Sequence, residues 1–136
     1  MVSVKNSIFY KDVLKELNYA FANVFIFKGF FIVEINEGVK YTWDNHGRQM
    51  ADDLAYFLGT DGEDIIYISN RIHSYSVVAQ DWLKFYRSSY KLKEYYVVSP
   101  NRKGTFNLLF EGMFFKKKIK NFTSLEEAVK LAKTNS

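Results

Sequence analysis

The side chains best suited to chemistry in this sequence lie close together, at Ser69, Asn70, Arg71, His73, Ser74, Tyr75 and Ser76. They follow a short apolar run, Ile65 to Ile68, and a helical pattern begins near Val77. In open α/β sheets, binding sites form where a strand ends and the next helix begins. The sequence therefore predicts a binding surface over residues 69–76 and the start of the following helix.

Two serines of this stretch, Ser74 and Ser76, come just before the helical pattern. Either one could cap the helix, which contributes about 1 kcal/mol. The free N–H groups and the dipole at a helix N-terminus also favour a phosphate on or near such a serine. Capping and phosphate binding are compatible, because the same residue can do both.

Arg71 could bind a carboxylate or a phosphate through two parallel hydrogen bonds. It could equally fix the loop, by donating to backbone carbonyls or to Asp44. Asn70, beside it, stands where the strand is expected to end. Both interpretations stay open at this point.

Catalysis and metal binding have little support. Ser74, His73 and Asp44 can be written as a hydrolase triad, but the glycines of a nucleophile elbow are missing around the serine. His46 and His73 are the only histidines and lack the spacing of a metal-binding pair. Cysteine is absent, which excludes thiolate metal sites and cysteine nucleophiles. We expect a non-catalytic protein without a metal or cofactor.

The composition is that of a compact domain. The chain has 136 residues, of which 48% are hydrophobic and 18% aromatic, so residues 1–136 are expected to form a single domain with a real core. No apolar stretch approaches the length of a membrane span. A signal-peptide pattern is also missing, so a cytoplasmic location is expected.

The net charge of +4 is mild and does not require a polyanionic partner. The lysine-rich segment 114–120 is best interpreted as a helix end followed by an edge strand that its lysines protect from aggregation. Specific binding of nucleic acid is therefore not expected.

The positions of these residues depend on the elements that hold them. Apolar alternation and short continuous apolar runs predict strands over residues 17–27, 30–36, 65–69, 95–98 and 118–122. Helical periodicity predicts helices over residues 43–58, 77–89, 102–115 and from 124 onward. Residues 1–16 form an arm without an assigned structure.

Three local signals fix helix ends. Thr42 is a suitable N-cap for the first helix, and Gly59 suits the position just after its end. Ser124 and Glu127 have the spacing of a capping box. The two-residue link 28–29 predicts an antiparallel hairpin, and strands joined through helices must run parallel. The fold class is therefore α/β, a mostly parallel sheet of about five strands with an N-terminal antiparallel hairpin and four helices.

This order of elements resembles the STAS domain in its SpoIIAA-like branch, which includes small stand-alone bacterial proteins. Three segments carry the resemblance: EINEGVKYTWD at 34–44, YISNRIHSYS at 67–76 and FTSLEEAV at 122–129. It extends over roughly residues 17–134 and concerns mainly the topology.

The resemblance implies a regulatory protein-interaction module of the anti-anti-sigma type. In such members a serine at the start of the helix after the third strand is phosphorylated by a partner kinase, which blocks binding. The matching positions are Ser74 and Ser76, with Ser69 nearer the strand. The Asp-Ser pair of those members is replaced here by residues 73–76. The implied partner is a regulatory kinase or a sigma-factor regulator.

A second hypothesis comes from the helix predicted over 102–115, which is apolar on more than one face. Its large side chains are Phe106, Leu109, Phe110, Met113, Phe114 and Phe115. Such a helix is either deeply buried, or its surplus forms a pocket wall or an exposed patch. A small apolar ligand, a lipid or a homodimer partner could bind there.

Overall fold

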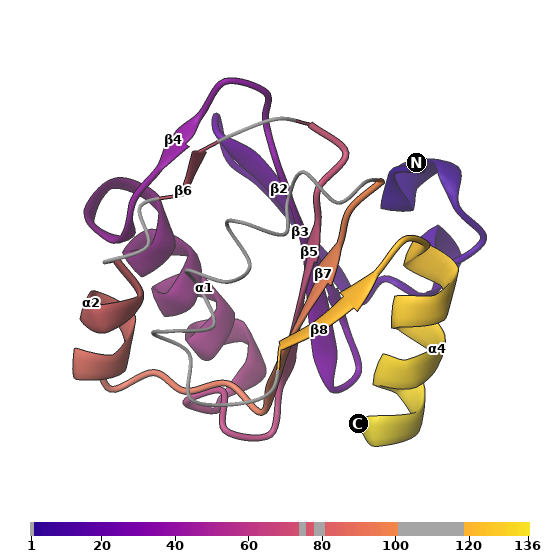
Figure 1. Cartoon of the computed structure of the whole chain (residues 1–136). Coiled ribbons are helices and arrows are strands. Elements are labelled where there is room, and N and C mark those ends of the chain that lie inside the picture. Colours follow the sequence, from indigo (N-terminus) through magenta and orange to yellow (C-terminus); the bar gives the residue numbers. More distant parts are fainter. Residues whose placement is uncertain (1, 74–75, 78–80, 101–118) are drawn as a thin grey trace.

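The structure is a computed structural model (Figure 1). It describes residues 2–73, 76–77, 81–100 and 119–136. The helix expected over 102–115 lies outside the described residues, as do Ser74 and Tyr75.

A mixed six-stranded sheet forms the centre of the molecule, which confirms the α/β class. Across the sheet its strands are β1 (Lys15–Asn18), β2 (Ala22–Phe27), β3 (Phe30–Ile35), β5 (Ile66–Asn70), β7 (Glu94–Val98) and β8 (Ile119–Phe122). The pairs β1–β2 and β2–β3 are antiparallel, and β3, β5, β7 and β8 run parallel. A separate two-stranded sheet pairs β4 (Lys40–Tyr41) with β6 (Ser76–Val77).

The sheet has one more strand than the sequence predicted. The chain turns back at residues 19–22, where the Tyr19 N–H donates to the Ala22 carbonyl at 2.8 Å, so residues 17–27 belong to two strands. Apolar alternation continues through this turn, and neither glycine nor proline marks it. The predicted hairpin over residues 28–29 is confirmed, with Gly29 at a φ of +85°.

Helices cover the sheet on both faces (Figure 1). The first predicted helix opens as a π-helical turn, η3 (Trp43–Gly47), and continues as α1 (Arg48–Leu58). Thr42 caps it, since its hydroxyl accepts from the Asn45 N–H, and Gly59 ends it at a φ of +70°. The last helix, α4 (Leu125–Asn135), begins at Ser124, whose hydroxyl accepts from the Glu127 N–H.

The second predicted helix was placed too early in the chain. α2 spans Asp81–Arg87, whereas Ser76 and Val77 belong to β6. Their pairing with Lys40 and Tyr41 overrides the local helical pattern, because β4 and β6 satisfy each other's backbone groups. Ser76 is therefore not the N-cap of this helix, and that prediction is wrong.

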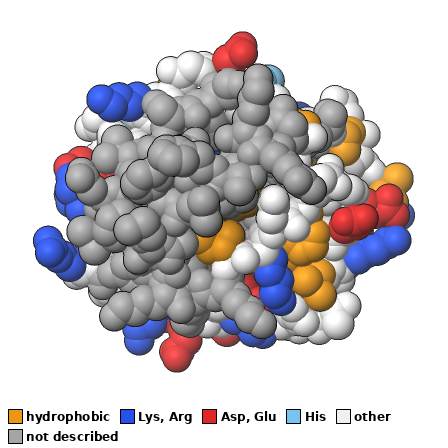
Figure 2. Space-filling model, viewed as in Figure 1, with side chains coloured by type: hydrophobic (Ala, Val, Ile, Leu, Met, Phe, Trp, Pro, Cys, Tyr) orange, Lys and Arg blue, Asp and Glu red, His pale blue; other side chains and the backbone are white. Residues whose placement is uncertain are grey.

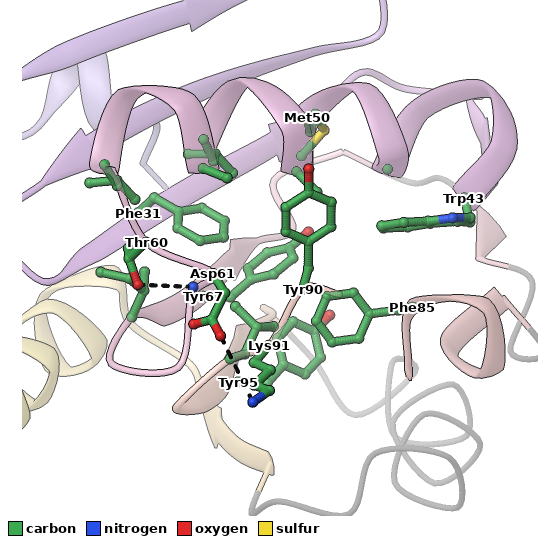
Figure 3. Close-up of a pocket in the computed structure, with 18 of the residues that line it drawn as sticks. Phe31, Trp43, Met50, Thr60, Asp61, Tyr67, Phe85, Tyr90, Lys91 and Tyr95 are labelled. Atoms are coloured by element: carbon green, nitrogen blue, oxygen red, sulfur yellow. Dashed lines mark hydrogen bonds and ion pairs between the residues drawn. The ribbon is translucent and has the colours of Figure 1, made fainter. Parts of the chain in front are cut away.

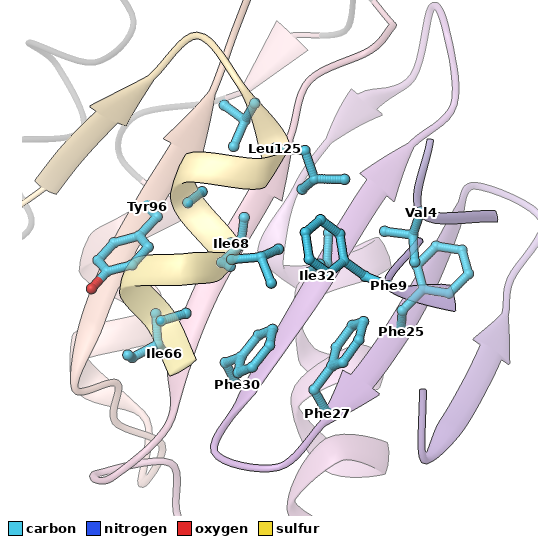
Figure 4. Close-up of a cluster of buried hydrophobic side chains, with 14 residues drawn as sticks. Val4, Phe9, Phe25, Phe27, Phe30, Ile32, Ile66, Ile68, Tyr96 and Leu125 are labelled. Carbon is cyan, nitrogen blue, oxygen red and sulfur yellow. The ribbon is translucent and has the colours of Figure 1, made fainter. Parts of the chain in front are cut away.

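The two faces of the sheet bury separate apolar clusters. α1 and α2 lie on one face, and α4 lies on the other (Figure 1). The cluster under α4 contains four phenylalanines together with isoleucines from β3 and β5 (Figure 4). The N-terminal arm joins the cluster under α4, where Val4 is fully buried and Phe9 nearly so. The arm includes two 3-10 turns, η1 (Val4–Asn6) and η2 (Tyr10–Asp12).

Charged side chains of both signs are interspersed around the rim of the face shown in Figure 2. The mild net charge is thus spread over the described part of this face. No helix among the described residues has the length and apolar character needed to cross a membrane.

Candidate functional site

An apolar pocket of about 100 Å³ lies between the sheet and α1 (Figure 3). Its floor is a row of three aromatic residues, Phe31 on β3, Tyr67 on β5 and Tyr95 on β7. They are direct neighbours in the strand register, and the ring centroids are 4.8 Å and 5.0 Å apart. Parallel pairing therefore builds a continuous aromatic surface from three separate parts of the sequence.

The walls of the pocket come from the helices on this face. Met50 and Leu54, both buried, project from α1 towards the sheet. Trp43 from η3 stands beside Phe85 from α2, with ring centroids 5.9 Å apart and planes at 78°. Tyr90 follows α2 and closes the aromatic wall, with its ring centroid 6.4 Å from that of Trp43 (Figure 3).

Polar groups on the walls have partners within the protein. The Tyr90 hydroxyl donates to the Asp52 carboxylate, and this hydrogen bond raises the pKa of Tyr90. The Tyr95 hydroxyl accepts from the Arg71 guanidinium at 2.9 Å. The pocket therefore presents mainly apolar surface to a ligand.

Short contacts hold the turn η3 in place, and with it the Trp43 ring that forms part of the pocket wall. The Trp43 backbone N–H donates to the Asp81 carboxylate at 2.5 Å. Asp44, the next residue, forms an ion pair with Lys84 at 2.8 Å, and that hydrogen bond lowers the pKa of Asp44. Gly47 allows the close packing, since a Cβ there would lie 2.9 Å from the Trp43 ring. Both carboxylates tie η3 to α2 across the pocket.

Residues 60–62 and Lys91 also line the pocket. The Lys91 N–H donates to the Asp61 carbonyl at 2.8 Å, and its ammonium lies 3.8 Å from the Asp61 carboxylate (Figure 3). The Thr60 hydroxyl accepts from the Gly62 N–H at 3.2 Å. This loop is held against the segment before β7 by backbone contacts.

The residues predicted as a binding surface are divided between the two faces of the sheet. Ser69 and Arg71 lie on the pocket side, where the Arg71 guanidinium donates to the Ser69 hydroxyl as well as to Tyr95. Asn70 points to the opposite face, because side chains alternate along a strand. Asp44 accepts from Lys84 and Arg48, so the suggested Arg71–Asp44 contact is not what fixes the loop.

Asn70 belongs to a buried polar cluster that holds the N-terminal arm. Its amide donates to the Glu34 carboxylate at 2.8 Å and to the Val2 carbonyl at 3.0 Å. Glu34 also accepts from the Ser3 hydroxyl at 2.6 Å and from the Val4 N–H at 2.9 Å. The position of Asn70 at the end of a strand therefore has a structural explanation.

His73 is exposed, Ser76 lies in β6, and Ser74 and Tyr75 lie outside the described residues. Within the described part of the chain, no three acidic, histidine or cysteine side chains gather as metal ligands would.

Sequence reasoning missed the pocket itself. It did predict the helix over residues 43–58 that carries Trp43, Met50 and Leu54. It had no means of showing that the tyrosines at 67 and 95 would stand side by side, because that depends on the order of the strands. Their polar hydroxyls within apolar strands were the available signal.

Comparisons with protein-family models, with curated proteins and with solved structures find no match for this chain. The resemblance to STAS domains therefore remains a prediction.

Proposed function

We propose that this protein acts by binding, and that its ligand is a small apolar molecule, or part of one, about the size of a single ring. The observation that supports this is the pocket on the α1 face, with its aromatic floor and its apolar walls. An apolar concavity of this kind is the default binding site in a protein of unknown function.

The size of the pocket sets the size of the ligand. A dry protein cavity of roughly 150 Å³ is known to hold benzene, and the space here is about 100 Å³. Pockets for larger ligands measure about 300–1,000 Å³. A single aromatic ring or a short alkyl group is thus favoured over a whole lipid chain, which narrows the lipid-binding alternative.

The chemistry of the walls sets the class of ligand. Aromatic pairs prefer offset or edge-to-face contacts, and the Phe31–Tyr67–Tyr95 floor presents ring surface for both. The Tyr90 and Tyr95 hydroxyls already have partners, so a ligand gains little from polar substituents. Toluene and indole are therefore suitable probes, and toluene is expected to bind at least as well as its more polar analogue phenol.

Filling the pocket should abolish binding. Ala51 lines the pocket from α1, so Ala51→Phe places a ring in the space that the ligand needs. We expect the affinity for toluene, measured by NMR titration, to fall by at least about tenfold. The matched control is Tyr56→Leu on the same helix, where the side chain is 92% exposed, and its affinity should equal that of the parent protein.

Thermal melting of both variants checks that the fold is retained. Ala55→Leu, a smaller change at another pocket-lining position, gives an independent measurement if Ala51→Phe melts early. Unchanged toluene shifts in Ala51→Phe, or no saturable binding by the parent protein at millimolar ligand, would overturn the proposal.

A regulatory protein-interaction module of the STAS type is the second candidate. What favours it is the exposed His73 in the loop that follows β5, at the edge of the sheet where the parallel strands end. Ser69 is only 1% exposed, so it is not accessible to a kinase in the folded protein. Phosphorylation mapped by mass spectrometry to Ser74 or Ser76 in protein from its host cell would support this candidate. A chain unmodified at both positions across growth conditions would count against the switch.

A further inference from the structure

The strand β1 stands at one edge of the six-stranded sheet, and its only neighbour among the described strands is β2. The Tyr19 N–H bonds the carbonyl of Ala22, which lies opposite it across the turn. Hydrogen-bonded and non-bonded pairs alternate along antiparallel strands. Leu17 therefore bonds its partner Val24, and the backbone N–H and C=O groups of Glu16 and Asn18 point away from the sheet.

An exposed apolar side chain adjoins this edge: Leu14, which directly precedes β1, is 63% exposed. The arm that leads into β1 carries three more, Val2, Ile8 and Tyr10, so four of the six large apolar side chains that are exposed in the described residues lie within residues 2–14. An open strand edge next to such side chains is a template for pairing with another chain.

We propose that β1 pairs antiparallel with β1 of a second copy of this chain, about a two-fold axis that passes through Leu17. In this register Glu16 of each copy lies opposite Asn18 of the other. Both residues carry the outward backbone groups, so four inter-chain hydrogen bonds form. The two Leu17 side chains then meet in a non-bonded pair, where side chains approach most closely.

Alternative registers fit less well. An axis through Glu16 places the two Glu16 carboxylates opposite each other, and like charges in directly opposite positions are destabilising. It also places the outward backbone groups of Asn18 opposite Leu14, whose own N–H is already bonded within the sheet. There Leu14 and Lys15 share one partner residue, because the Leu14 N–H donates to the Ile26 carbonyl at 2.8 Å while Lys15 lies opposite Ile26. In the Leu17 register, by contrast, the outward backbone groups of Glu16 and Asn18 all find partners in the second copy.

The pairing edge is short, so the dimer is weak and reversible. Stable interfaces bury more than about 1,000 Å² in total, and a four-residue strand with its neighbouring arm supplies less than a long edge would. Sedimentation velocity of the full chain should show monomer at low micromolar concentration and dimer at hundreds of micromolar, which corresponds to a Kd on the order of 10⁻⁴ M.

Asn18 allows a test by change of charge, because its side chain is exposed and is expected to face Glu16 of the second copy. Asn18→Lys should strengthen the dimer severalfold, and Asn18→Glu should weaken it severalfold. A simple loss of the amide would move both variants in the same direction. The Glu16 carboxylate also pairs with Lys5 at 3.2 Å and accepts from Tyr10 at 2.8 Å within its own chain. Opposite shifts therefore indicate that residue 18 faces a carboxylate of the second copy.

The absence of cysteine allows a direct test of the register. Leu17→Cys should form an inter-chain disulfide under mild oxidation, because the Cβ atoms of a non-bonded pair lie close to disulfide distance. Lys15→Cys, on the same strand but off the axis, should cross-link several times more slowly. Circular dichroism of each variant confirms folding.

Three results would overturn the proposal. One is a monomer at every concentration, and another is the same direction of shift in both Asn18 variants. The third is faster cross-linking at Lys15→Cys than at Leu17→Cys. If Leu17→Cys unfolds, the Asn18 pair still decides, because that position is exposed.

Discussion

Replacing Glu34 by alanine is expected to lower the free energy of unfolding by about 3 kcal/mol. Glu34 is only 4% exposed, and its carboxylate accepts from Ser3, Val4 and Asn70. Removal of the carboxylate leaves these donors without their acceptor in a buried place, and each unsatisfied buried group costs about 1–3 kcal/mol. Urea denaturation followed by circular dichroism measures the change.

The matched control is Glu126→Ala on the surface of α4. The Glu126 carboxylate also has a partner, the Lys130 ammonium at 3.0 Å, but its side chain is 59% exposed. Exposed ion pairs contribute about 0–1 kcal/mol. A Glu34→Ala loss no larger than that of the control would show that the buried cluster is not what fixes the arm.

A double-mutant cycle of Glu34 and Asn70 measures how strongly these two side chains interact. Asn70→Ala alone removes one donor to Glu34 and the contact with the Val2 carbonyl. Because the two side chains interact directly, the combined loss should be smaller than the sum of the single losses by about 1 kcal/mol or more. Limited proteolysis should also cut within residues 2–13 faster in Glu34→Ala, since Val4 loses its anchor.

The sequence was sufficient for elements whose signals are local. The final helix was predicted from Ser124 and Glu127, and the first from Thr42 and Gly59, because caps act within one turn. Strands β3, β5 and β7 followed from continuous apolar runs, which are typical of strands buried on both faces. These predictions required no knowledge of distant partners.

Predictions failed where distant residues decide the outcome. Ser76 and Val77 form a strand because Lys40 and Tyr41 lie beside them, and nothing within residues 70–80 carries that information. The candidate site has the same dependence. Its floor joins residues that are far apart in the chain, from Phe31 to Tyr95, and only the order of the strands brings them together. The sequence predicted correctly where β5 ends. The pocket, however, lies on the face of the sheet that α1 covers.

Gly62 combines an unusual backbone with a crowded position, and Gly62→Ala should cost about 3 kcal/mol or more of folding stability. Its φ is +100°, and a Cβ there would lie 2.0 Å from the backbone carbonyl oxygen of Lys91. A backbone atom cannot rotate away as a side chain can. The loop 60–62 must therefore separate from Lys91, and the hydrogen bond from the Lys91 N–H to the Asp61 carbonyl is lost with it.

Gly38→Ala isolates the steric part of this cost. Gly38 also has a positive φ, +79°, but a Cβ at this position would have no neighbouring atom within 4 Å. Only backbone strain of about 1–2 kcal/mol therefore applies. Equal losses in the two variants would show that the contact with Lys91 relaxes freely. Because residues 60–62 and Lys91 line the pocket, Gly62→Ala should also weaken toluene binding, whereas Gly38→Ala, outside the lining, should leave it unchanged. The glycine thus links the stability of the loop to the shape of the site.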